Sequence, residues 1–86
     1  MCSYVTEKGE VVGSGKGPAG WFRLTHAMTY LDHPFHAPYE HTLNIDFVNE
    51  KEGPSARVAV ELTADSAREL VRLVEAALRA GGEATR

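Results

Sequence analysis

The 86-residue chain has one cysteine, no excess of positive charge and no apolar run long enough to cross a bilayer. A single cysteine excludes an intramolecular disulfide, which fits a reducing compartment. Nine Lys and Arg against twelve Asp and Glu give a net charge of -3, so a phosphate backbone is not the expected partner. The first residues contain no apolar signal-peptide core. We therefore expect a cytoplasmic protein that neither spans a membrane nor binds nucleic acid.

The length and periodicity of the chain predict a single domain, residues 1–86, of mixed structure. Extended-structure residues and apolar alternation predict strands over residues 3–7, 10–13, 21–32, 42–49 and 56–62, with a turn at Lys8-Gly9. A helical period follows over 64–80, with Thr63 as N-cap, and residues 81–86 are expected to fray. This order predicts an α+β fold: an antiparallel meander of four to five strands with one C-terminal amphipathic helix packed on one face.

The alternation also predicts which side chains share a face of the sheet. In strand 21–32 the inward face is expected to carry Phe22, Leu24, His26, Met28 and Tyr30. Its partners in strand 42–49 are expected to be Leu43, Ile45 and Phe47, with Tyr30 roughly opposite Leu43. His26 then faces about Phe47, about 13 Å from the loop that follows, and is expected to be a hydrogen-bonded core residue. The opposite face is mixed in polarity. Long strands in so short a chain favour a homo-oligomer.

Residues 32–41 contain three of the four histidines, in the sequence Asp-His-Pro-Phe-His-Ala-Pro-Tyr-Glu-His. Histidine is the commonest metal ligand, and Pro34 and Pro38 restrict the backbone of this loop. The spacing indicates a site for a divalent transition metal, zinc by default, with Glu40 or Cys2 completing the set. Cys2 would offer an amine and a thiol together if Met1 were removed. The predicted ligands are His33, His36, His41 and Cys2.

An open coordination position would allow a metal-bound water to be activated, with Glu40 as general base acting on a small molecule. Two other functions remain open. The first is a metal-free binding module, in which the histidine loop and the glycine segment rim a ligand pocket or a subunit interface. The second is a purely structural subunit that forms an oligomer.

The segment Gly13-Ser14-Gly15-Lys16-Gly17 superficially resembles a nucleotide-binding loop. It lacks the first glycine of the phosphate-binding motif and has Gly17 where a Ser or Thr is required. The glycine pattern of dinucleotide-binding proteins also matches, but a strand follows it instead of a helix. We expect a turn here, able to act as a flap over a site.

Three segments together resemble a family of small, uncharacterised bacterial proteins. They are the Met-Cys-x-Tyr start, the Gly-Ser-Gly-Lys-Gly segment, and Asp-His-Pro-x-His-Ala-Pro-x-Glu-His with the strand after it. The resemblance covers nearly the whole chain. It implies no activity and points to Cys2, the glycine segment and the histidine loop as the places where function resides.

Overall fold

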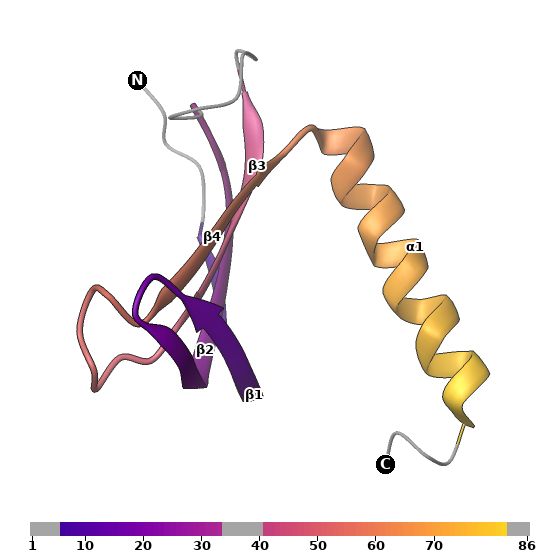
Figure 1. Ribbon diagram of the computed structural model, residues 1–86. Coiled ribbons are helices and arrows are strands. Elements are labelled where there is room, and N and C mark those ends of the chain that lie inside the picture. The colour runs from indigo at the N-terminus through magenta and orange to yellow at the C-terminus, as the bar shows by residue number, and fades with distance from the viewer. Residues whose placement is uncertain (1–5, 34–40, 83–86) are drawn as a thin grey trace.

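The computed structural model describes residues 6–33 and 41–82. Within these ranges, four strands form one antiparallel sheet in the order β1-β2-β3-β4, and a helix follows (Figure 1). The elements are β1 (Glu7–Gly17), β2 (Gly20–Asp32), β3 (Thr42–Val48), β4 (Arg57–Leu62) and α1 (Ala64–Gly81). The predicted α+β class, the meander and the C-terminal helix are confirmed.

The first strand differs from its prediction. Lys8 and Gly9 lie inside β1 and pair with Met28 and Ala27 of β2, so the hairpin predicted from strands 3–7 and 10–13 is wrong. The chain instead reverses at Pro18-Ala19, where Gly20 takes a φ of +114° that favours glycine. β1 pairs with β2 from Gly20 to Thr29, apart from a bulge between Glu10 and Gly13, and so satisfies the backbone groups of that edge. β-propensity alone does not locate a turn.

The glycine segment belongs to this strand, so the predicted turn at residues 13–17 is also wrong. Its glycines allow the end of β1 to approach the start of β4 closely. A Cβ at Gly17 would lie 3.1 Å from the carbonyl oxygen of Arg57 and 3.3 Å from that of Ser55. A Cβ at Gly15 would lie 3.3 Å from Val58. The sheet therefore curls until its two edge strands meet at one end.

The register of β2 on β3 corrects the predicted faces. Tyr30 lies opposite Asn44, and His26 lies opposite Val48, one residue away from the expected pairing. A shift of one residue moves a whole strand's side chains to the other face. The apolar face therefore combines alternate residues of three strands: Ala27, Thr29, Leu31, Leu43, Ile45, Phe47, Val58, Val60 and Leu62. The polar face carries Met28, Tyr30, Asp32, Thr42, Asn44, Asp46, Ala59 and Glu61.

Burial in the sheet is unusual because it favours polar side chains. Among the described residues, Ala56 is the only apolar residue that is fully buried. Four polar residues are buried: Thr42, Asn44, Asp46 and Asn49. The apolar face is only half-buried. A single chain therefore forms a thin apolar core.

The helix begins at the predicted residue and ends one residue later than predicted, and it packs more loosely than expected. Thr63 caps it by accepting a hydrogen bond from the Ser66 backbone N–H at 3.1 Å, with Asp65 in the first turn and Arg79 in the last. None of its residues is buried. Thr63 is the single residue between β4 and α1, so the helix leaves the sheet at once and stands beside it (Figure 1). In the described part of the chain, no helix is long and apolar enough to span a membrane.

Candidate functional site

Two of the predicted metal ligands lie side by side where β2 ends and β3 begins. Asp32 pairs with Thr42, and extending this register by one residue places His33 opposite His41. Their ring centroids are 4.9 Å apart with an interplanar angle of 29°. Both residues are exposed. The hairpin thus brings together two imidazoles that are eight positions apart in the sequence.

The separation of the two rings is compatible with a shared ion, although their orientation is not yet that of a chelate. With a Zn–N distance near 2.0 Å, two imidazoles on one ion have centroids about 4.5–5.2 Å apart. The stacked rings would have to rotate about their side-chain torsions so that one nitrogen of each points at the ion. His33 also donates its backbone N–H to Asp32 Oδ1 at 2.7 Å, which ties the end of β2 to the first loop residue.

The other predicted site residues, His36, Glu40 and Cys2, lie outside the described residues. Residues 6–33 and 41–82 contain no group of three or more His, Cys, Asp or Glu side chains arranged to hold a metal. Of the predicted site residues, the structure therefore describes His33 and His41.

His26 is separate from this pair, as the alternation predicts. Six residue steps separate His26 from Asp32 at the end of β2, about 20 Å of strand. Its Nδ1 lies 2.8 Å from Thr25 Oγ1 and 3.4 Å from Glu50 Oε1. Consecutive side chains of a regular strand point to opposite faces, so the contact between Thr25 and His26 shows that β2 is irregular here. The irregularity lies at a bulge where two residues of β1 face the single residue Thr25. The polar ring of His26 is thus satisfied, as expected.

Glu50 ties this cluster to the first strand. Its carboxylate pairs with the Lys8 ammonium, and its backbone N–H donates to Thr25 Oγ1 at 3.1 Å. The hydrogen bond from Lys8 is the main influence that lowers the pKa of Glu50, and the nearby His26 adds to it. The cluster is exposed on the Glu50 and Lys8 side. It connects β1, β2 and the loop after β3.

A third group of polar residues lies on the polar face and was missed by the sequence analysis. Tyr30 Oη donates to Asp46 Oδ2 at 3.2 Å, and Arg57 Nη2 donates to Asp46 Oδ1 at 3.0 Å. Thr42 Oγ1 donates to Asn44 Oδ1 at 2.6 Å in the same strand. Burial is the main influence that raises the pKa of Tyr30, and the Asp46 carboxylate adds to it. This network satisfies the polar groups that occupy the centre of the sheet.

The signal for this network was present in the sequence. Polar residues alternate with apolar ones along β3: Thr42, Asn44 and Asp46. This pattern predicts one polar and one apolar face, but it does not show on which face Tyr30 of β2 lies. The register decides this.

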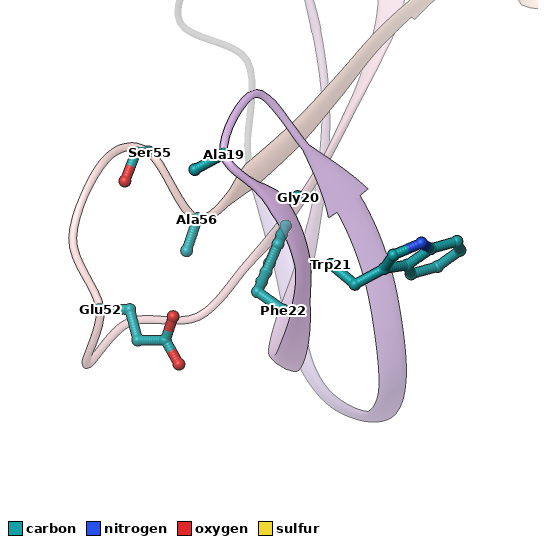
Figure 2. A pocket seen from close by; sticks show the side chains of 7 residues that line it. All are labelled: Ala19, Gly20, Trp21, Phe22, Glu52, Ser55 and Ala56. Carbon is teal, nitrogen blue, oxygen red and sulfur yellow. The ribbon is translucent and has the colours of Figure 1, made fainter.

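A small hollow of about 130 Å³ lies between the β1–β2 turn and the loop from β3 to β4 (Figure 2). Phe22 lies against it, whereas the Trp21 side chain points away, on the other side of the strand (Figure 2). Besides Trp21 and Phe22, the hollow is lined by Ala19, Gly20, Glu52, Ser55 and Ala56. The hollow is smaller than the roughly 300 Å³ at which small-molecule pockets begin. It does not by itself indicate a ligand site.

Comparison with known proteins defines the family of the chain. The model of a family of unknown function, DUF6295, matches residues 1–86. The chain belongs to this family. No curated protein and no solved structure matches it. The resemblance to an uncharacterised family of small proteins is therefore confirmed, and DUF6295 carries no described activity to this chain.

Proposed function

We propose that the protein binds a divalent transition metal, zinc by default, through His33 and His41. The observation that supports this proposal is the adjacency of the two imidazoles, 4.9 Å apart at the mouth of the β2–β3 connection. Imidazole nitrogen is a favourable ligand for zinc, copper and nickel. Two cross-strand ligands on a paired hairpin require side-chain rotation but no movement of the sheet. His36, Glu40 and Cys2 remain the sequence-based candidates for further ligands.

The proposal extends to chemistry if water keeps one coordination position. Glu40 is then the candidate general base for metal-assisted hydrolysis or a lyase-type reaction on a small molecule, in a cytoplasmic setting.

Titration of zinc into tag-free, metal-stripped protein tests the metal proposal. We expect His33→Ala and His41→Ala each to weaken zinc binding at least about tenfold, because changes outside the ligand shell already weaken binding by that amount. Calorimetry gives the affinity, and the absorption bands of cobalt(II) report the ligand geometry. His26→Gln is the matched control, since it removes a histidine about 20 Å away. Absence of zinc, cobalt and nickel uptake by the unaltered protein would contradict the proposal.

A second candidate function is a homo-oligomer-forming module without a metal. The specific observation in its favour is the exposed apolar surface of α1, which includes Val71 and Val74 at 58% and 50% exposure. In this alternative, the histidine loop rims an interface or a ligand pocket. Substituting His33 and His41 together separates the two functions: the module predicts altered association or ligand affinity with unchanged metal content. The two proposals are compatible, because a metal-binding protein of this size also benefits from a partner.

A further inference from the structure

The apolar side of α1 is an unpartnered surface in the described part of the chain. At 100° per residue, one side of the helix carries most of its large apolar residues, and all of them are exposed by 39–58%. We call these residues the α1 stripe: Leu70, Val71, Leu73, Val74 and Leu78. The charged residues Arg68, Arg72, Glu75 and Arg79 lie on the opposite side.

The total exposed surface is too large for a compact monomer. A globular chain of 9.4 kDa exposes about 5,000 Å², whereas this chain exposes 6515 Å². The radius of gyration is 14.2 Å, against about 12 Å for a compact domain of this length. The helix α1, none of whose residues is buried, contributes to this surplus.

The charges of α1 fit a second copy of the same helix. Arg68 pairs with Asp65 at 2.8 Å and Arg72 pairs with Glu69 at 2.6 Å, so most of the charge is neutralised within the helix. Three acidic and three basic residues between 64 and 81 give the helix no net charge. The first turn carries Asp65 and the last turn carries Arg79. An antiparallel copy would place the acidic end beside the basic end and would oppose the two helix dipoles.

We infer that α1 packs antiparallel against α1 of a second copy of this chain, about a two-fold axis near the middle of the helix. The inference rests on the proposed self-association and names its surface. In a two-fold interface the same patch meets itself, so residues near the axis contact their own counterparts. The middle of Ala64–Gly81 lies between Arg72 and Leu73. Leu73 is the stripe residue closest to the axis, and Val71 and Val74 are equally near it on either side. Of these two, Val74 lies at the centre of the stripe and Val71 at its edge.

Sedimentation equilibrium of the full chain in EDTA tests this interface without any contribution from metal. The unaltered protein is expected to be a dimer. Val74→Glu is expected to weaken dimerisation at least about a hundredfold, because each interface would bury two like charges. Ala76→Glu is the matched control, since it adds the same carboxylate two residues away, about 200° around the helix. This control is expected to remain a dimer.

A cross-linking experiment covers the case in which Val74→Glu fails to fold. In a Cys2→Ser background, Val74→Cys is expected to cross-link to itself with a short bismaleimide, whereas Ala76→Cys is not. A monomeric unaltered protein would overturn both the self-association and this interface. A dimer that Val74→Glu leaves intact, with no cross-link at position 74, would overturn the α1 interface alone. Zinc binding is measured separately, so neither result depends on it.

Discussion

At the scale of single residues, the structure separates the three histidines that it describes into two groups with different surroundings. His33 and His41 meet across the hairpin, and His26 joins Thr25 and Glu50 about 20 Å away. This separation could be predicted because a strand has a fixed rise, even though the predicted register was off by one residue. The polar network around Asp46 could not be predicted. It depends on which residue lies opposite Tyr30, and the alternating pattern admits either register.

Tyr30→Phe is the sharpest test of the polar network. Removing the hydroxyl deletes its bond to Asp46, so we expect a loss of about 1 kcal/mol of unfolding free energy at pH 8. The pKa of Tyr30 is raised above 10.0 in the folded chain, so its contribution is complete below pH 10 and declines as the pH rises further. The difference between Tyr30→Phe and the unaltered protein should therefore shrink by pH 11. Urea unfolding at both pH values measures it, and an equal difference at both would contradict the assignment.

At the scale of elements, the helix and three strands follow from periodicity, whereas the extent of the first strand does not. Thr63 and the apolar period define α1 to within a residue of the predicted 64–80, because capping is a local interaction. The glycine segment misled the sequence analysis. Glycine favours turns by composition, but here it permits two edge strands to approach, which is a long-range requirement.

Gly17→Ala and Gly9→Ala form a matched pair within β1 that tests this close approach. A Cβ at Gly17 would lie 3.1 Å from both the Arg57 carbonyl oxygen and the Phe22 ring, so we expect a loss of about 1–3 kcal/mol of unfolding free energy. A Cβ at Gly9 would have no atom within 4 Å, and that substitution should be neutral or slightly stabilising. Chemical denaturation of the two variants gives the comparison. Equal stability would show that β1 does not approach β4 in solution.

At the scale of the whole molecule, polar burial and apolar exposure point in the same direction. The centre of the sheet is occupied by Thr42, Asn44 and Asp46, whereas the apolar face and the α1 stripe retain solvent access. Burying apolar surface is the main source of folding free energy, so a chain that leaves this much exposed has little stability alone. The sequence predicted an oligomer from strand edges. The exposed apolar residues of α1, none of which is buried, support placing the proposed contact on the helix instead.

This arrangement predicts that thermal stability depends on protein concentration. If folding and dimerisation are coupled, each tenfold dilution removes about 1.4 kcal/mol from the dimer by mass action. Two chains of 86 residues unfold with an entropy of about 0.36 kcal/mol/K, so the Tm should fall by about 4 °C per tenfold dilution. Calorimetry or circular dichroism over a hundredfold range of concentration measures this slope, and Ala76→Glu should retain it. A Tm independent of concentration would mean that one chain is stable with its α1 stripe exposed, and the apolar surface of α1 would then need a different explanation from self-association.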